Sequence, residues 1–251
     1  YDGEKVGITR LNAKLGRSSL SGLVARLDLK AGPQLEVLSG ESAILLDEIF
    51  PWLSSLEKFK GVAKDLKSLK GTIALSHLEW NGPLFDPEKC RFRIGGEVEN
   101  LFVDLSLLPG PVSVPGAKFE ITPEKVSLSD ARVGILDASL RAEGVLHDYQ
   151  EGLRHIDLTF QADIGSKIME WVWDQARLPE KLRVRPLSVS QAHVAWDRNG
   201  KTSFTGDIAA KEGARIFIDM FYQPEEFTIN RMLIQDAEST AALALALQKR
   251  E

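Results

Sequence analysis

The sequence predicts a mainly β protein of antiparallel strands in repeated modules, with a few short helices. Turn signals recur at short intervals, among them Gly82-Pro83, Gly95-Gly96 and Asn199-Gly200. Turn residues at such regular intervals indicate many short strands. Between the turns, apolar and polar residues alternate, and this period of two is typical of strands with one buried and one wet face.

The alternation is clearest in residues 155–164 and 214–222. In both runs every second residue is apolar, so one face of each predicted strand avoids water. The apolar positions that we expect to line a continuous face are Ile156, Leu158, Phe160, Ile216 and Ile218. For each of them an ordinary β-sandwich core is the alternative.

Two stretches have the spacing of helices. Residues 42–70 carry an apolar residue every three or four positions, and Pro51 can open a second helix, so we predict helices at about 42–50 and 52–67. A shorter helix is predicted at about 166–176, with Ser166 as its candidate N-cap and an end before Pro179.

Residues 241–247 favour helix by composition but alternate Leu with Ala. A helix would spread Leu243, Leu245 and Leu247 over opposite sides, so we predict a strand. Both faces of this strand would be apolar, which requires full burial or a hydrophobic ligand. Leu243 and Leu245 therefore join the candidate face.

A possible internal repeat links two parts of the chain. Phe119-Glu120-Ile121 resembles Phe227-Thr228-Ile229 at an offset of 108 residues, and Asp130-Ala131 resembles Asp236-Ala237 at an offset of 106. Upstream of each copy lies a strand that ends in Trp, at Trp80 and Trp196. The alternative is coincidence, since short β patterns match easily and a Trp at a strand end is often a core anchor.

Composition excludes several classes of protein. With 251 residues, 43% of them hydrophobic and 27% charged, the chain is not mainly disordered. Its longest apolar run has seven residues, against roughly 20 for a membrane-spanning helix. A net charge of −5 argues against a nucleic-acid partner. The single cysteine excludes an internal disulfide and Cys-rich zinc sites.

The sequence predicts no enzyme, no metal site and no cofactor. The four histidines lack metal-ligand spacing, and no phosphate loop, nucleophile elbow or dinucleotide fingerprint occurs. Cys90 lies between Lys89 and Arg91, which could lower the pKa of its thiol, although a buried or incidental cysteine is the commoner case. Carboxylates are abundant, so a hydrolase of the cell envelope that uses Asp or Glu for acid–base catalysis stays an alternative function.

A basic run accompanies the second predicted helix. The lysines face away from its apolar stripe, and such a helix can rest on an anionic membrane surface. A surface helix packed on a sheet has the same pattern, so both interpretations stay open. The run consists of Lys58, Lys60, Lys64, Lys67 and Lys70.

Several short segments resemble the periplasmic part of AsmA/TamB-like proteins of Gram-negative bacteria. The segments are Leu69-Lys70-Gly71-Thr72-Ile73-Ala74-Leu75, Trp80-Asn81-Gly82-Pro83-Leu84, Leu108-Pro109-Gly110-Pro111-Val112, Leu178-Pro179-Glu180-Lys181-Leu182, Arg185-Pro186-Leu187, and Leu233 to Ala241. The resemblance implies antiparallel strands curled into a taco-like groove whose apolar inner face holds acyl chains. It implies a repeating β-groove that moves phospholipid between inner and outer membranes and so serves outer-membrane biogenesis.

The resemblance also implies partners and a location. It implies a periplasmic segment of an inner-membrane-anchored protein, with phospholipid or another acyl-chain ligand and neighbouring modules of the same longer chain as partners. The chain starts at Tyr1 and is interpreted as an excerpt whose membrane anchor is missing. No catalytic residues carry over, because the family has no such motif. A non-catalytic scaffold for outer-membrane protein or envelope assembly is the alternative function.

Four segments are expected along this array. Residues 1–70 would hold strands and amphipathic helices that join upstream modules, and 71–165 a first β module. Residues 166–185 would form a helical link, and 186–251 a second β module.

Overall fold

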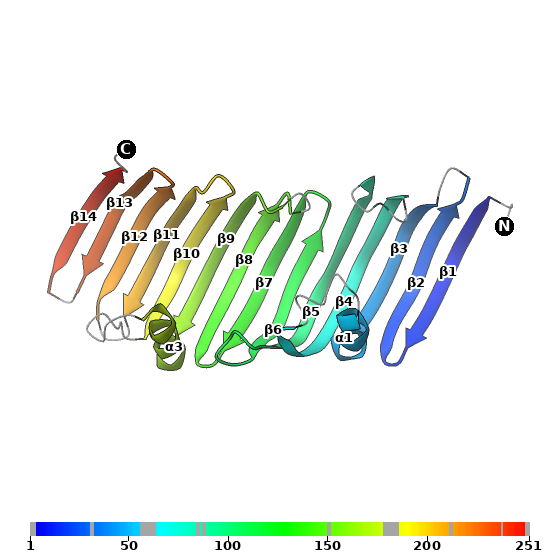
Figure 1. The fold of residues 1–251 in the computed structure, drawn as a ribbon, viewed down its shortest axis with the longest axis horizontal. Helices are drawn as coiled ribbons and strands as arrows, with labels where there is room; N and C mark the ends of the chain where they lie inside the picture. Colours follow the sequence, from blue (N-terminus) through cyan, green and yellow to red (C-terminus); the bar gives the residue numbers. More distant parts are fainter. Residues whose placement is uncertain are drawn as a thin grey trace. The chain divides into compact units, whose positions relative to one another are not determined.

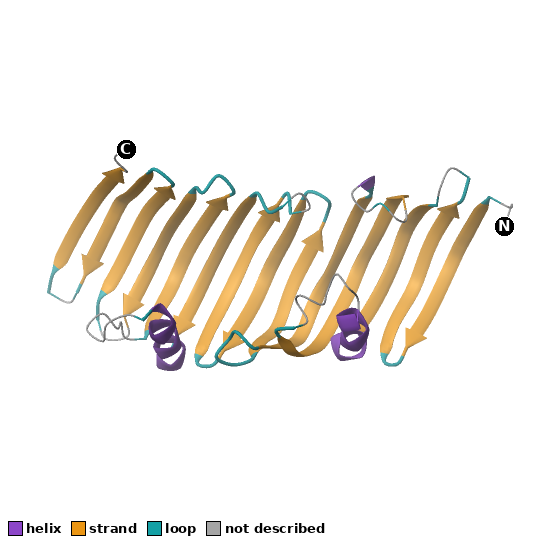
Figure 2. Ribbon diagram, viewed as in Figure 1, coloured by secondary structure: helices purple, strands orange, loops and turns teal. Residues whose placement is uncertain are grey.

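The protein is mainly β, as the sequence predicts (Figures 1 and 2). A computed structural model describes residues 4–30, 33–55, 64–83, 86, 89–149, 152–177, 186–210, 213–236 and 238–248. Its 14 strands form one antiparallel sheet in which each strand pairs with its neighbours in sequence, from β1 at one edge to β14 at the other. The chain is therefore a succession of hairpins without a crossover.

The strands are 9 to 18 residues long. Their bounds are β1 Lys5–Leu15, β2 Ser18–Asp28, β3 Gln34–Leu45, β4 Leu66–Pro83, β5 Arg91–Leu105, β6 Val112–Ile121, β7 Lys125–Ile135, β8 Ala138–His147, β9 His155–Ile164, β10 Leu187–Asp197, β11 Thr202–Ala210, β12 Arg215–Gln223, β13 Glu226–Gln235 and β14 Thr240–Gln248. Within the described ranges two helices interrupt them, α1 Leu46–Ser55 and α3 Ser166–Ala176.

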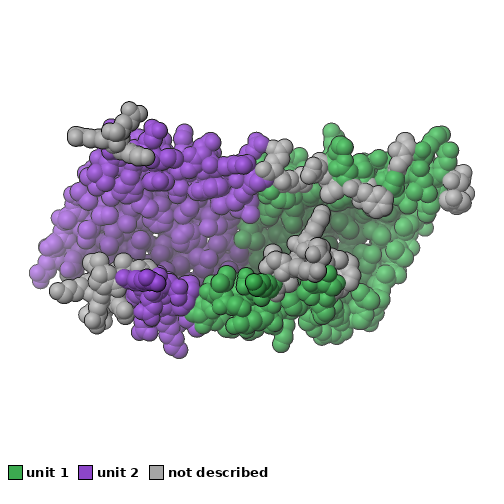
Figure 3. Space-filling view, viewed as in Figure 1, with its two compact units in different colours: residues 1–129, 148–151 green, residues 130–147, 152–251 purple. Residues whose placement is uncertain are grey.

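The chain divides into two compact units (Figure 3). The first comprises residues 1–129 and 148–151, and the second comprises residues 130–147 and 152–251. The division falls inside β7, and the four segments expected from the sequence stay a prediction. Strands β1–β6 belong to the first unit and β8–β14 to the second.

A structural repeat relates the first strands of the two units. Both ends of β7 lie 120 residues after those of β1, and β8 and α3 also begin 120 residues after β2 and α1. In each case three strands are followed by a helix and then three more strands. Among the described residues the repeating element is therefore six strands and one helix, and the hairpin β13–β14 follows the second copy.

This repeat corrects half of the sequence alignment. Trp80 and Trp196 lie on β4 and β10, which are equivalent strands. Phe119 and Phe227 lie on β6 and β13, which are not equivalent, because β13 corresponds to β7 and β1. The sequence alignment therefore matched Phe119 with Phe227 on strands that are not equivalent. Such a mismatch is easy because any strand with one apolar face can show Phe-x-Ile.

The helices predicted at 42–50 and 52–67 are partly wrong. Residues 42–45 belong to β3, where they pair with Thr72–Leu75 of β4, and a single helix α1 includes Pro51. Residues 56–63 lie outside the described part of the chain. Lys67 and Lys70 lie on β4, so the five lysines do not form one basic helical face. Pairing with two neighbouring strands outweighs the helical spacing here.

The helix predicted at 166–176 is confirmed as α3, but its N-cap is Gly165 and not Ser166. The carboxylate of Asp137, in the β7–β8 turn, accepts hydrogen bonds from the backbone N–H groups of Lys167 and Ile168 at 2.9 and 3.1 Å. These bonds and the helix N-terminus lower the pKa of Asp137. A Cβ on Gly165 would lie 2.3 Å from that carboxylate, so the turn and the helix require glycine there.

In the first repeat the carboxylate belongs to the helix and the N–H groups belong to the first hairpin. Glu48 of α1 accepts hydrogen bonds from the N–H groups of Arg17 and Ser18, in the β1–β2 turn, at 2.8 and 3.0 Å. The Ser18 hydroxyl also donates to Glu48, at 2.8 Å. In both repeats one carboxylate thus joins the helix to the turn of the first hairpin.

We expect Glu48→Gln to lower the stability of the first unit at neutral pH and to flatten its dependence on acid. The hydrogen bonds lower the pKa of Glu48 to about 2, below the usual value of about 4.3. The folded state therefore holds this proton less tightly than the unfolded state, so the contribution is full above about pH 5 and is lost as the pH falls toward 2.

Thermal unfolding at pH 7 and between pH 5 and 2.5 checks this prediction. Glu41→Gln, on β3 outside these contacts, is the matched control. Identical acid profiles for Glu48→Gln and the unmodified protein would contradict it.

Candidate functional site

The strand registers bring all seven candidate residues onto one face of the second unit. Residues that are directly opposite in an antiparallel pair point to the same side of a sheet. One row of opposite residues runs Leu158, Val194, Phe204, Met220, Ile229 and Leu245, and a second runs Phe160, Ala192, Gly206, Ile218, Met232 and Leu243. We call this the apolar face of β9–β14.

Two further rows complete the apolar face. They run Ile156, Trp196, Thr202, Tyr222, Phe227 and Leu247, and Ala162, Val189, Ile208, Ile216, Ile234 and Ala241. Strand β8 extends the face with Leu140, Ala142, Gly144 and Leu146. In these four rows of described residues, only Thr202, Trp196 and Tyr222 carry a polar side-chain group. Five strand spacings give the face a width of roughly 24 Å across β9–β14.

The opposite face of the second unit is polar over β8–β11. It carries alternate residues such as Arg141, Glu143, Asp157, Thr159 and His193. His193 and Asp157 form a contact of 3.1 Å between Nε2 and Oδ1. Over β8–β11 the second unit therefore has one wet side and one side that avoids water.

The apolar face is not sealed as a closed core. No large side chain among the described residues is less than 2% exposed, and the accessible surface of 16693 Å² exceeds the roughly 11,000 Å² expected for a compact protein of 27.8 kDa. The most buried residue of the face is the small, central Ala192 at 0% exposed, and Val189 and Ile229 are also buried. Leu243 and Leu245 on β14 are 48% and 38% exposed. The described helices thus leave much of this face accessible, and Figure 3 shows the hollowed side of the unit.

Register shifts keep the apolar residues on one face where strict alternation fails. In β13, Ile229 and Met232 are three residues apart, yet they oppose Met220 and Ile218, which share a face. A shift between them absorbs the extra residue. The same spacing and shift occur at Ile8 and Leu11 of β1.

The sequence analysis did not predict these register shifts, although the sequence contains a pattern that indicates them. The equivalent strands β1, β7 and β13 share apolar–x–apolar, two polar residues, then apolar again. The three copies read Val6-Gly7-Ile8-Thr9-Arg10-Leu11, Val126-Ser127-Leu128-Ser129-Asp130-Ala131 and Phe227-Thr228-Ile229-Asn230-Arg231-Met232. In the second copy Asp130 has a φ of 50°, the left-handed conformation that bulges use. This six-residue pattern marks the first strand of each repeat.

The first unit has an apolar face of its own. Trp80 opposes Val37 on one side and Phe92 on the other, and the Trp80 and Phe92 rings stack with centroids 5.4 Å apart. Beyond Val37 the row continues to Ala25, which is 3% exposed. Both units therefore pair an apolar face with aromatic side chains at strand ends.

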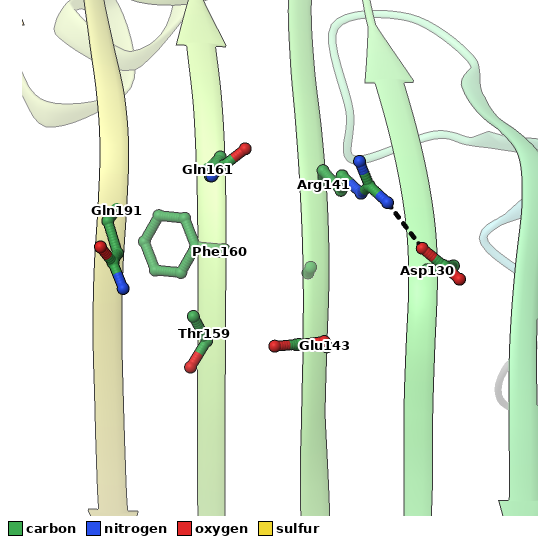
Figure 4. Close-up of a pocket in the computed structure, with 8 residues that line it drawn as sticks. Asp130, Arg141, Glu143, Thr159, Phe160, Gln161 and Gln191 are labelled. Atoms are coloured by element: carbon green, nitrogen blue, oxygen red, sulfur yellow. Dashed lines mark hydrogen bonds and ion pairs between the residues drawn. The ribbon is translucent and has the colours of Figure 1, made fainter.

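A depression of about 350 Å³ lies at β7–β10 of the second unit (Figure 4). Its lining includes Asp130 and Arg141, whose carboxylate and guanidinium are 2.7 Å apart, together with Glu143, Thr159 and Gln161. The candidate residue Phe160 also lines it, with its ring between β9 and β10 in the figure. The charged pair is satisfied internally, so the depression offers no obvious site for an apolar ligand.

Metal ligation and thiol chemistry find little support in the described residues. They contain no group of three or more His, Cys, Asp or Glu side chains placed to hold a metal ion. Cys90 is 3% exposed, and burial followed by the charge of Asp86 raises the pKa of its thiol. The expectation that Lys89 and Arg91 could lower this pKa is therefore wrong.

No helix in the described part of the chain has the length and hydropathy needed to span a bilayer. Comparisons with family models, curated proteins and solved structures found no match to this chain. What the protein does has therefore to be inferred from the two faces of its sheet.

We expect Gly144→Ala to destabilise the second unit by about 1–3 kcal/mol. Gly144 lies on the apolar face opposite Leu158, and a Cβ there would come within 2.3 Å of the Asp157 carbonyl oxygen. This contact is with backbone, so it cannot be relieved by turning a side chain. Gly7→Ala is the matched control, because a Cβ at Gly7 meets nothing within 4 Å. Urea unfolding of both variants checks the difference, and equal midpoints would contradict the prediction.

Proposed function

We propose that this chain binds lipid acyl chains on its apolar faces and supports the transport of phospholipid between the inner and outer membranes. In this proposal it is a periplasmic segment of an inner-membrane-anchored, AsmA-like protein, with neighbouring modules of the same longer chain as its partners. It is not an enzyme. The observation that carries the proposal is the four-row apolar face of β9–β14, which the described helices leave open.

The physical driving force is the transfer of methylene groups from water to this face. Each buried CH₂ contributes roughly 0.8 kcal/mol, so a long acyl chain gains most from an apolar surface without polar breaks. Leu245, Ile229 and Met220 belong to one unbroken row, and Leu243, Met232 and Ile218 to the next. These rows cross the strands and give an acyl chain a continuous surface.

Charged groups of the polar face support a non-catalytic role. Asp130 pairs with Arg141, and Asp157 contacts His193. Asp137 and Glu48 have a lowered pKa because they accept backbone hydrogen bonds, and these bonds hold helices in place. Their perturbation therefore has a structural cause.

The test compares two adjacent residues on opposite faces of β12. Ile218 lies on the apolar face, whereas Phe217 lies on the other face beneath Arg231, 5.9 Å from its ring centroid. We expect Ile218→Asp to weaken binding of a fluorescent fatty-acyl probe more than tenfold, because a carboxylate on the path of an acyl chain must lose water. Phe217→Asp should bind the probe as the unmodified protein does.

Far-UV circular dichroism and unfolding midpoints of both variants control for loss of fold, and Ile218→Ser is the milder variant if the carboxylate prevents folding. Native mass spectrometry of detergent-free protein should show bound lipid in the unmodified chain. Equal probe binding by both Asp variants, or no probe binding by the unmodified protein, would refute the proposal.

A scaffold in envelope assembly is the second candidate, favoured by the regular, uncharged strand β14 at the edge of the described sheet. Exposed strand edges attract further strands. In that case polar substitutions on the apolar face would leave function intact, whereas substitutions that block the β14 edge would abolish it.

A further inference from the structure

The polar side chains of the apolar face of β9–β14 lie side by side in a single row. Trp196 of β10 is opposite Thr202 of β11, and Thr202 is opposite Tyr222 of β12. This row is the one nearest the turns β10–β11 and β12–β13. The other three rows of described residues carry no polar side-chain group. We call the row of Trp196, Thr202 and Tyr222 the aromatic end of the face.

The opposite end of the face is aliphatic. The row that includes Ile208 is followed there by a further row of Ile164, Leu187 and Ala210. Helix α3 begins two residues after Ile164, beside the ends of β9 and β10 (Figure 1). We call these two rows the aliphatic end. Among their described residues no side chain can form a hydrogen bond with a ligand.

The donors of the aromatic end are available to a ligand. Trp196 has an indole N–H, and Thr202 and Tyr222 have hydroxyls. None of the three side chains hydrogen-bonds to the described part of the chain, and Tyr222 is 49% exposed. Trp and Tyr are typical of boundaries between an apolar surface and water, because their rings are apolar and carry one polar atom. The β10–β11 turn beside them adds two exposed cations, Arg198 and Lys201.

The face is long enough along its strands for a whole acyl chain. Ile164 lies eight residues after Ile156 on β9, so the apolar surface extends roughly 27 Å in this direction. One acyl chain spans roughly 15 Å, half of the hydrocarbon core of a bilayer. A chain whose polar group meets the aromatic end can therefore lie entirely on apolar side chains. In the reverse orientation its polar group would lie on aliphatic side chains without a hydrogen-bond partner, which is unfavourable.

We propose that the aromatic end hydrogen-bonds a carboxyl oxygen of an acyl lipid, and that the acyl chain runs along the strands from Trp196 toward Ile164. This inference rests on the proposed function and adds to it an orientation and a ligand chemistry. The ligand needs an oxygen acceptor at one end of a hydrocarbon chain. The ester of a phospholipid and the carboxylate of a free fatty acid both supply one.

Fluorine NMR of protein that contains fluorotryptophan tests the orientation. The resonance of Trp196 is the one lost in Trp196→Phe, and Ile208→Trp adds a reporter at the aliphatic end. A nitroxide on the bound lipid broadens nearby resonances, and this broadening falls steeply with distance. We expect a nitroxide beside the carboxyl group to broaden Trp196 most, and one beside the terminal methyl to broaden the reporter at position 208 most.

Each nitroxide position is placed in a fatty acid and in a phosphatidylcholine, which distinguishes the two sources of the carboxyl group. The comparison of the two nitroxides at Trp196 determines the orientation even if Ile208→Trp does not fold.

Two threonines on opposite faces of β11 test the hydrogen bond. Thr202→Val removes a hydroxyl from the aromatic end, and Thr205→Val removes the same group from the polar face, where it is opposite His193. We expect Thr202→Val to weaken binding of a fatty acid about two- to tenfold, as the loss of one hydrogen bond predicts. Tyr222→Phe should have the same effect. Both variants should bind hexadecane, which has no oxygen, as the unmodified protein does, and Thr205→Val should change neither ligand.

Three results would overturn the orientation. The first is equal or reversed broadening at Trp196 by the two nitroxides. The second is unchanged fatty-acid affinity in both Thr202→Val and Tyr222→Phe, and the third is an equal loss of affinity for fatty acid and hexadecane. In each of these cases lipid still binds, so the proposed function would remain. A lack of binding by every lipid probe would overturn both proposals.

Discussion

The structure of the second unit depends on one constraint, which is that each strand from β8 to β14 must present a run of apolar residues to the same side of the sheet. Side chains alternate with a period of two, so a one-residue slip of any strand would move its whole apolar set to the wet face. Where the sequence places apolar residues three apart, as at Ile229 and Met232, a register shift restores the phase. Extra residues are thereby absorbed without a break in the apolar face.

The same constraint determines how the units are held together. A single sheet with one accessible apolar face cannot draw on a closed core, and the described residues have none. Its stability must come from the hydrogen-bond ladders, from cross-strand rows and from small central residues such as Ala192. The two helices are tied to hairpin turns by the carboxylates of Glu48 and Asp137, and they also bury Leu46 of α1 and Ile168 and Met169 of α3. Polar contacts therefore fix the strand ends, and the middle of the face stays free.

Much of this was predictable from local patterns. Period-two alternation correctly predicted the β class and the terminal strand at 241–247. The strand registers place the seven candidate residues on one face, and their role in binding stays a prediction. The helix at 166–176 also followed from spacing. Residues 42–45 were mistaken for helix because their strand state depends on pairing with β2 and β4, which spacing within the segment does not reveal. The 120-residue repeat was missed because its strands share a pattern and few identical residues.

The apolar face and the strand backbones have different requirements. Burial of apolar surface is non-directional, so any ligand with enough methylene groups can cover the rows that include Ile218 and Leu158. A strand backbone offers directional N–H and C=O groups at fixed spacing, and only another strand in register can satisfy them. In β14 the leucines belong to the apolar face while the backbone pairs with β13. Each strand that pairs in register therefore widens the apolar face and leaves it accessible, so strand pairing and acyl binding are compatible.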